Sequence, residues 1–158
     1  MPNWCVGDLR IRGSRENIKR FLLDGLKPVS AYGEDAEALE YNDETDYDLL
    51  QVIVKGGTSL YICGTQRGFV EEEFYVDFES DSDSKIACIP NVKFAWEIDV
   101  GGLSAISKKY DVDFRMYGFE CGMEFNQDVK IVNGVVIKNI QTNIADYRWE
   151  CICPSKGG

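Results

Sequence analysis

Residues 92–110 read VKFAWEIDVGGLSAISKKY, and this stretch joins the pattern of a β-strand to that of an α-helix. Apolar residues occupy every second position from Val92 to Ile98, which is typical of a strand. From Gly101 the apolar spacing changes to three and four residues, which predicts a helix that ends near Tyr110. The two lysines before Tyr110 complement the negative end of the helix dipole. The stretch therefore predicts a core strand followed by a helix.

The chain opens on a similar unit. Apolar residues in the run that ends at Gly13 predict a first strand. Ser14 is a typical N-cap residue, and the apolar stripe behind it predicts a helix of about three turns. That stripe consists of Ile18, Phe21 and Leu22. Gly25 follows where a glycine often ends a helix in the left-handed conformation.

Turn signals divide the rest of the chain. Leu49–Val54 and Leu60–Cys63 flank Gly56-Gly57, which predicts a hairpin. Asn133-Gly134 predicts a two-residue type I′ turn between two antiparallel strands. Alternating apolar and charged residues at 147–151 predict a closing strand.

Together these elements predict the fold class. Two strand–helix units separated by further strands favour an α+β fold, an antiparallel sheet with two helices on one face. Two split βαβ motifs would give a ferredoxin-like arrangement with an extra C-terminal hairpin. We expect residues 1–158 to form one domain with an acidic insertion at about 28–48.

Three segments also carry a resemblance to a known family. They are Pro2-Asn3-Trp4-Cys5, the helix after Gly13-Ser14, and the block from Leu103 to Phe125. These segments resemble the YubB-type ferredoxin-like family of plasmid and phage proteins over the first strand and helix and the C-terminal third. The resemblance implies a ferredoxin-like sheet without an iron–sulfur cluster, encoded on a mobile element, in a family without an established biochemical activity.

The composition argues against catalysis and against metal binding. The chain has no histidine, which removes the commonest general base and the commonest metal ligand. Of its six cysteines, Cys151 and Cys153 lack the spacing of a zinc or thioredoxin-like motif, and no other pair is close. The chain shows no signal peptide and no apolar run of about 20 residues. We therefore expect a cytoplasmic protein with reduced cysteines, no enzymatic activity, no cofactor and no metal.

Two further motifs fall short of a ligand site. The acidic run from Glu79 to Asp83 begins like a calcium loop but lacks its glycine and its final glutamate. Gly64–Gly68 is rich in glycine but lacks the lysine and hydroxyl of a P-loop. An ordinary turn is the simpler interpretation, with Arg67 paired to a neighbouring carboxylate.

Charge is distributed unevenly along the chain. Residues 34–83 hold 15 of the 27 acidic residues against only Lys55 and Arg67, whereas the other residues are slightly basic. Along the strand predicted from Phe69, acidic residues share one face. They are Glu71, Glu73, Asp77, Glu79, Asp81 and Asp83. Such a ladder could imitate a nucleic-acid backbone, and the plainer alternative is a solvated edge that prevents aggregation.

Two function classes stay open. The first is a non-enzymatic interaction protein whose acidic ladder binds a basic surface of a host protein. The host protein could be a nuclease or a CRISPR effector. The present protein would then be a nucleic-acid mimic or an anti-defence inhibitor such as an anti-CRISPR. The alternative is a small-ligand binding module or an uncharacterised enzyme that uses the sheet cleft around Trp96, Tyr117 and Glu120.

Direct binding of nucleic acid is disfavoured by the net charge of −10. Five cations near the N-terminus could nevertheless contact nucleic acid. In a homodimer, they could instead neutralise the acidic half of the second copy. These are Arg10, Arg12, Arg15, Lys19 and Arg20.

Overall fold

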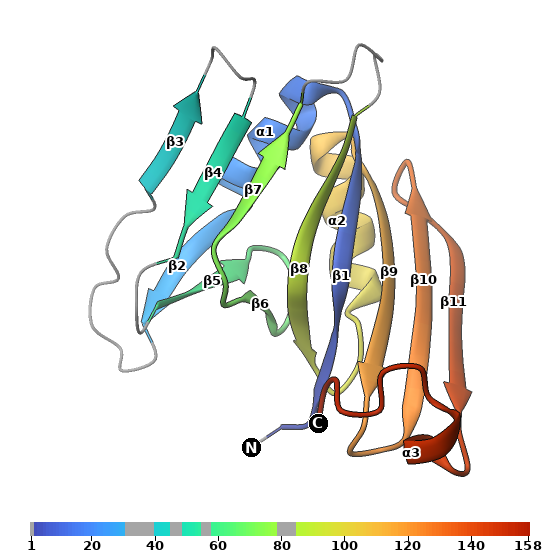
Figure 1. Ribbon diagram of the computed structural model, residues 1–158. Helices are drawn as coiled ribbons and strands as arrows, with labels where there is room; N and C mark the ends of the chain where they lie inside the picture. Colours follow the sequence, from blue (N-terminus) through green and yellow to red (C-terminus); the bar gives the residue numbers. More distant parts are fainter. Residues whose placement is uncertain (1, 31–39, 45–48, 55–57, 79–84) are drawn as a thin grey trace.

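The computed structural model describes residues 2–30, 40–44, 49–54, 58–78 and 85–158. Within these ranges the chain forms eleven strands and three helices (Figure 1). In chain order they are β1 (Trp4–Gly13), α1 (Arg15–Asp24), β2 (Leu26–Ser30), β3 (Glu40–Glu44), β4 (Leu49–Ile53), β5 (Thr58–Ile62), β6 (Gly68–Val70), β7 (Phe74–Asp77), β8 (Lys85–Ala95), α2 (Val100–Tyr110), β9 (Asp113–Glu120), β10 (Phe125–Val132), β11 (Val135–Asn143) and α3 (Tyr147–Glu150).

The strands form two antiparallel sheets. The large sheet has eight strands in the order β11-β10-β9-β1-β8-β6-β5-β2, and the small sheet has the order β3-β4-β7. The N-terminal strand β1 lies inside the large sheet, where it pairs with β8 and β9. Helices α1 and α2 cover one face of the large sheet (Figure 1). We call the opposite face of β1, β8, β9, β10 and β11 the open face.

Alternating burial along the strands separates these two faces. Leu9 and Ile11 on β1 and Phe114 on β9 are almost fully buried, whereas their neighbours in sequence are more exposed. Phe21 of α1 packs edge-on against Phe114, with ring centroids 5.5 Å apart. Most apolar residues of these strands therefore point to the helices, whereas the open face carries charged side chains together with Ile86 and Tyr117.

The two long helices begin as capping chemistry requires. The hydroxyl of Ser14 accepts a hydrogen bond from the backbone N–H of Asn17 at 3.1 Å, which confirms the predicted N-cap. The prediction of a left-handed residue at Gly25 is wrong, because its φ is −89°. Glycine is needed there for space, since a Cβ would lie 2.6 Å from the carbonyl oxygen of Phe21.

The ferredoxin-like fold class predicted from the sequence is wrong. The chain is mostly sheet, with eight antiparallel strands in the large sheet, a separate small sheet and three small helices. Strands β6 and β5 lie between β8 and β2, so the large sheet is wider than two split βαβ motifs would make it. The segment 28–48, predicted to be a loop insertion, contributes to β2 and contains β3.

The hairpin predicted around Gly56-Gly57 is also wrong. Strand β4 pairs with β3 and β7 in the small sheet, whereas β5 pairs with β2 and β6 in the large sheet. The chain changes sheets again between β6 and β7, where Glu71, Glu72 and Glu73 are not in a strand. Apolar runs in two different sheets look alike in sequence, because alternation does not reveal the partner strand.

The C-terminal part contains one confirmed prediction and one error. Asn133 and Gly134 have φ values of 50° and 74°, and they join β10 to β11 in the predicted hairpin. Residues 147–150 form the short helix α3 in place of the predicted closing strand. The hydroxyl of Tyr147 donates to Oδ1 of Asn126 at 2.7 Å, and this buried hydrogen bond fixes α3 against β10.

Candidate functional site

The structure describes three of the six residues in the predicted acidic ladder and does not place them on one strand. Glu71 follows β6 and forms an ion pair with Lys93 of β8, in the large sheet. Asp77 lies at the end of β7 in the small sheet and Glu73 directly precedes that strand, and both are exposed. Glu79, Asp81 and Asp83 lie outside the described residues. Within the described part of the chain, the ladder is therefore interrupted at the change of sheets.

The predicted sheet cleft does not bring its three residues together. Glu120 is completely buried, and its carboxylate accepts hydrogen bonds from the backbone N–H groups of Gly122 at 2.8 Å and Met123 at 2.6 Å. Glu120 thus stabilises the turn after β9. Trp96 and Tyr117 line different cavities. The cleft around Trp96, Tyr117 and Glu120 is therefore not a single site.

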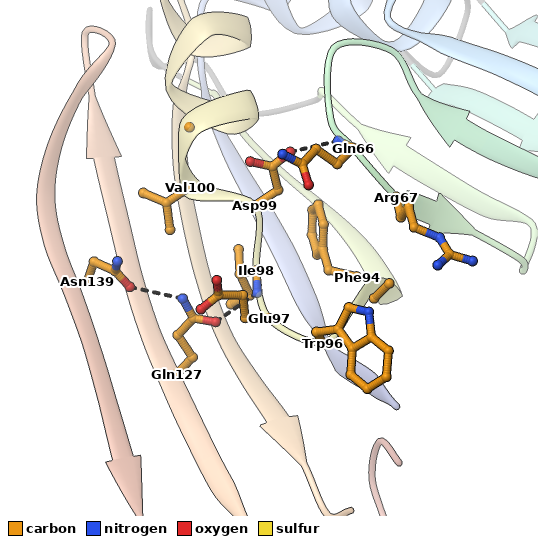
Figure 2. A pocket seen from close by; sticks show the side chains of 12 residues that line it. Gln66, Arg67, Phe94, Trp96, Glu97, Ile98, Asp99, Val100, Gln127 and Asn139 are labelled. Carbon is orange, nitrogen blue, oxygen red and sulfur yellow. Dashed lines mark hydrogen bonds between the residues drawn. The ribbon is translucent and has the colours of Figure 1, made fainter. Parts of the chain in front are cut away.

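Trp96 lines a cavity of about 310 Å³ where β8 ends and α2 begins (Figure 2). Its backbone φ is +71°, in the left-handed region, so β8 ends at Ala95, before the predicted end at Ile98. The indole is half exposed, and the guanidinium of Arg67 is directed away from the other polar groups (Figure 2). Arg67 has no side-chain hydrogen bond or ion pair with a described residue, so the pairing expected from the sequence stays a prediction.

Several polar side chains of this cavity are used by the fold itself. Oδ2 of Asp99 accepts the backbone N–H of Gln66 at 2.7 Å, and its Oδ1 caps α2 through Gly102 at 2.9 Å. Oε1 of Gln127 accepts the backbone N–H of Ile98 at 2.7 Å, and its Nε2 donates to Asn139 at 2.9 Å. The side chains of Asp99, Gln127 and Asn139 are therefore engaged by the fold, whereas the guanidinium of Arg67 has no partner among the described residues.

A row of cations crosses the open face of the large sheet. Arg10 on β1 lies opposite Arg115 on β9, and Arg115 lies opposite Lys130 on β10. Lys130 in turn lies opposite Lys138 on β11. We call these four residues the cationic row. Directly opposed like charges destabilise a sheet, so this arrangement has a cost to the fold.

Counter-ions neutralise only part of this row. Asp128 forms ion pairs with both Arg115 and Lys138, the latter at 2.9 Å. Arg10 and Lys130 form no hydrogen bond or ion pair with any residue that the structure describes. Two of the four cations therefore have no hydrogen-bonded or ion-paired partner among the described residues, although the charge of Arg10 acts on the nearby carboxylate of Asp8.

The surroundings of the row add further charges of both signs. Arg12 binds Asp113 at 2.6 Å, and Lys156 binds Asp8 at 3.2 Å. Partial burial acts to raise the pKa of Asp8, but the N–H of Asn91 and the charge of Lys156 together hold that pKa below its usual value. Together with the four residues of the cationic row, Arg12 and Lys156 make six cations. They are accompanied by three carboxylates, Asp8, Asp113 and Asp128, in a chain whose net charge is −10.

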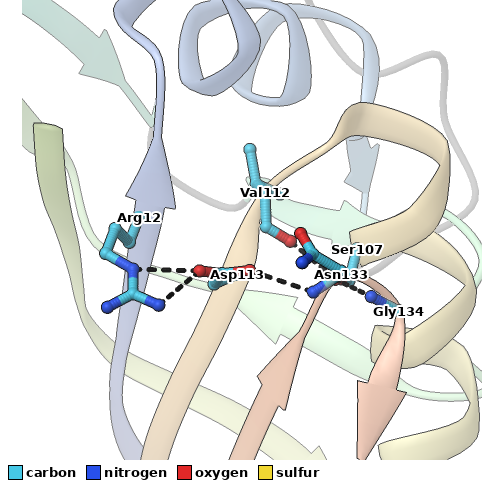
Figure 3. A network of polar contacts seen from close by, with 6 residues as sticks. All are labelled: Arg12, Ser107, Val112, Asp113, Asn133 and Gly134. Carbon is cyan, nitrogen blue, oxygen red and sulfur yellow. Dashed lines mark hydrogen bonds and ion pairs between the residues drawn. The ribbon is translucent and has the colours of Figure 1, made fainter. Parts of the chain in front are cut away.

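A polar network holds the hairpin that supplies half of the row (Figure 3). Asp113, which binds Arg12, also accepts the backbone N–H of Asn133 at 3.0 Å. The hydroxyl of Ser107 on α2 accepts the N–H of Gly134 at 2.9 Å and donates to the carbonyl of Val112 at 2.6 Å. The β10–β11 turn is therefore fixed to both α2 and β9, which positions Lys130 and Lys138.

Two hollows lie beside each other along the row. They have volumes of about 230 and 330 Å³, and Arg10 and Arg115 line both of them. The larger hollow is also lined by Tyr117 and Phe119, whose rings meet edge to face with centroids 5.2 Å apart. Tyr117 is 40% exposed. The open face thus combines cations with an accessible aromatic ring.

Sequence reasoning found only part of this surface. Arg10 and Arg12 lie on it, but Arg15 and Arg20 belong to α1, where they stack on Phe78 and Tyr110. Lys19 is also on α1. The predicted cluster of five cations is therefore divided between the open face and α1.

Lys138 was missed for a reason of register. A regular two-residue hairpin would pair Lys130 with Ile137. A bulge shifts the pairing between Lys130 and Ile131, so that Lys130 faces Lys138.

Other classes of site receive no support from the structure. In the described part of the chain, no group of three or more His, Cys, Asp or Glu residues is arranged to hold a metal ion. Among the same residues, no helix has the length and apolar character needed to cross a bilayer. Comparison with known proteins yields no matching family model, no matching curated protein and no matching solved structure.

Proposed function

We propose that this protein is a non-enzymatic binding protein whose open face binds single-stranded nucleic acid. The observation that carries the proposal is the cationic row, in which four adjacent strands each place one cation in register. Because neighbouring strands are about 4.8 Å apart, the row extends over roughly 14 Å. A row of that length can contact several phosphates of one strand.

The cost of the row supports a role in binding. Opposed cations destabilise the free sheet, and an acidic chain gains no solubility from them. A bound polyanion would neutralise Arg10 and Lys130, which have no ion pair with a described residue. Binding would therefore convert a repulsive arrangement into an attractive one.

The aromatic ring beside the row favours a nucleic acid over a simple anion. Proteins that bind single strands combine a positive surface for the backbone with aromatic rings for the bases. Tyr117 is exposed next to Arg115 in the larger hollow, so it is placed for such stacking. The net charge of −10 opposes binding at a distance, but screening limits that effect to about 10 Å at 0.1 M salt.

The test is a fluorescence anisotropy titration with a labelled 12-nucleotide single strand of DNA or RNA. Wild type should bind, and Tyr117→Ala should lose about 1–3 kcal/mol of binding free energy if a base stacks on this ring. Trp149→Ala is the matched control, because Trp149 is an exposed aromatic residue of α3 that does not line either hollow. Equal binding by wild type and by a protein with both Arg10→Gln and Lys130→Gln would contradict the proposal.

A second candidate function keeps the acidic surface as the recognition element. Glu73, directly before β7, and Asp77, the last residue of β7, flank Tyr75, which is 70% exposed. An exposed aromatic residue between carboxylates suits the contact with a basic protein. The partner would be a basic host protein, such as a nucleic-acid-binding defence effector, inhibited by a protein encoded on a phage or another mobile element.

This second candidate has a separate test. A pull-down from host lysate at low and high salt should capture a partner with wild type, and salt should release it. Charge reversal by Glu73→Lys and Asp77→Lys should abolish capture, whereas Arg10→Gln should not. Unchanged capture by the charge-reversed protein would exclude this surface.

A further inference from the structure

The cavity where β8 ends and α2 begins contains two charged side chains of opposite sign that do not pair with each other. Both Arg67 and Glu97 line it, and both are exposed. Neither forms a hydrogen bond or an ion pair with a residue that the structure describes. In Figure 2 the carboxylate of Glu97 lies on the side of Gln127, the guanidinium of Arg67 lies on the other side, and the indole of Trp96 lies between them. One cation and one anion of this cavity are therefore available to a further molecule.

The backbone at Trp96 is strained and firmly held. Its φ of +71° and the hydrogen bond from the N–H of Glu97 to the carbonyl of Ala95, at 3.0 Å, are those of the rare and strained form of the γ-turn. The N–H of Trp96 donates to the carbonyl of Asn3 at 2.8 Å, and the N–H of Ala95 donates to that of Arg67 at 3.1 Å. Strained residues persist where their surroundings fix them in this way, and they cluster at ligand sites.

Burial of the indole does not explain this strain. Trp96 is 54% exposed, although an aromatic ring contributes most to stability when it is buried. Glycine would adopt this φ without a steric cost. The fold therefore gains less from a tryptophan at this position than a ligand would. A rigid, exposed indole at a cavity is suited to stack on a flat ring.

We propose that this cavity binds a guanine mononucleotide. The base stacks on the indole of Trp96, its donor edge binds the carboxylate of Glu97, and its phosphate binds the guanidinium of Arg67. An ionised carboxylate accepts two parallel hydrogen bonds, and guanine offers two adjacent donors in its N1–H and its exocyclic amine. Adenine has an amine beside a ring nitrogen that only accepts. A volume of about 310 Å³ is at the lower end of the range for small-molecule sites, which suits one nucleotide.

The positions of the two charges favour a nucleotide over an amino acid. Glu97 directly follows Trp96, whereas the backbone of Arg67 is bonded to Ala95, which directly precedes Trp96. The charges therefore flank the ring. A free aromatic amino acid carries both of its charges on one carbon atom, at one end of its ring. A nucleotide carries the donor edge of its base and its phosphate at opposite ends.

The cavity is separate from the open face. Val100 and Gly101 of α2 line it, and α2 covers the opposite face of the large sheet (Figure 1). Arg10 and Arg115 of the cationic row line other hollows. The inference therefore does not rest on the proposed binding of single strands, and Arg10→Gln should bind the mononucleotide as wild type does.

The first experiment is calorimetric titration with guanosine 5′-monophosphate (GMP) and its adenine counterpart (AMP). Wild type should bind GMP with a Kd at or below about 1 mM, and at least about tenfold more tightly than AMP, because a hydrogen bond to a charged group is at stake. Glu97→Gln should remove this preference. Glu150→Gln, at an exposed glutamate of α3 outside the cavity, is the matched control and should keep it. Absence of GMP binding, or equal binding of GMP and AMP by wild type, would overturn the proposal.

The second experiment tests the ring and the strain together. Trp96→Gly should weaken GMP binding about 5- to 150-fold through the loss of stacking. Its urea midpoint should not fall, because glycine adopts a positive φ without strain. Trp149→Ala removes an exposed indole outside the cavity and should leave the affinity unchanged. Unchanged affinity of Trp96→Gly, or its loss of stability, would overturn the assignment of this ring to a ligand.

The third experiment tests the position of the phosphate. Arg67→Gln should weaken GMP binding at least about tenfold and leave the binding of guanosine, which has no phosphate, unchanged. Equal losses for GMP and guanosine would overturn the role of Arg67. A 12-nucleotide strand that begins with guanosine 5′-phosphate distinguishes two sources of the same group. The free nucleotide is the ligand if GMP competes fully for the part of binding that Glu97→Gln removes, and the end of a strand is the ligand if only the strand shows that part.

Discussion

Replacing Arg10 with glutamine should weaken the binding of nucleic acid without lowering the stability of the protein. Arg10 lies opposite Arg115 and has no ion pair with a described residue. Opposed like charges cost a few tenths to about 1 kcal/mol, and the nearby carboxylate of Asp8 offsets part of that cost. The free energy of unfolding of Arg10→Gln should therefore stay within about 0.5 kcal/mol of wild type, or rise slightly.

The effect on binding follows from the number of cations in the row. For a single strand, each neutralised phosphate contributes about −0.7 to the slope of log K against log salt, so four cations give a slope of about −2.8. Between 50 and 200 mM salt, that slope lowers the affinity about 50-fold, whereas a slope of about −2.1 for three cations lowers it about 20-fold. Arg10→Gln should thus bind more weakly and depend less on salt.

The assay is anisotropy of a labelled single strand at four salt concentrations, combined with urea unfolding of the same samples. Lys109→Gln is the matched control, because Lys109 is an exposed cation of α2 on the other side of the sheet. The control should keep the wild-type slope. If Arg10→Gln and Lys109→Gln show the same slope as wild type, the cationic row does not contact phosphates and the reasoning fails.

Three further predictions concern the fold that carries the row. Gly7→Ala should cost about 1–3 kcal/mol in urea unfolding, because its Cβ would lie 2.3 Å from the carbonyl oxygen of Tyr117 on β9; wild-type stability would show that β1 and β9 can move apart. Glu120→Ala should cost about 1.5–3 kcal/mol, because the backbone N–H groups of Gly122 and Met123 lose a buried carboxylate acceptor, and a loss below about 0.5 kcal/mol would contradict that role. Burial raises the pKa of the Cys5 thiol from 9.0 to about 12, so its contribution to stability is present below pH 9 and is lost as the pH rises toward 12. Unfolding measured from pH 8 to 11 should show a flatter decline for Cys5→Ala than for wild type, and identical curves would exclude this contribution.

Local features of the sequence predicted local features of the structure well. The Ser14 cap, the first helix and the Asn133-Gly134 turn depend on interactions between residues close in sequence, so their signals are contained in short stretches. The partners of each strand depend on distant residues. The pattern that predicted one hairpin at 49–63 belongs to two strands in separate sheets, and nothing in either strand specifies its sheet.

The candidate site could not be predicted for the same reason. The cationic row uses residues from four strands, and only pairing across β1, β9, β10 and β11 brings them into line. The predicted acidic ladder assumed one continuous strand after Phe69, whereas the chain leaves the large sheet at Val70. Charge counted along a sequence therefore indicated the sign of one surface but missed a surface of the opposite sign.

The central position of β1 has a consequence for how the protein is made. This strand leaves the ribosome well before its neighbours, because both β8 and β9 come from residues 85–120. At a synthesis rate of about 5–20 residues per second, the wait between Gly13 and Lys85 is roughly 4–15 s. During that interval Leu9 and Ile11 have no sheet to enter, so the nascent chain exposes an apolar segment that chaperones could bind. Slow codons before residue 85 would prolong this exposure and should lower the yield of soluble protein.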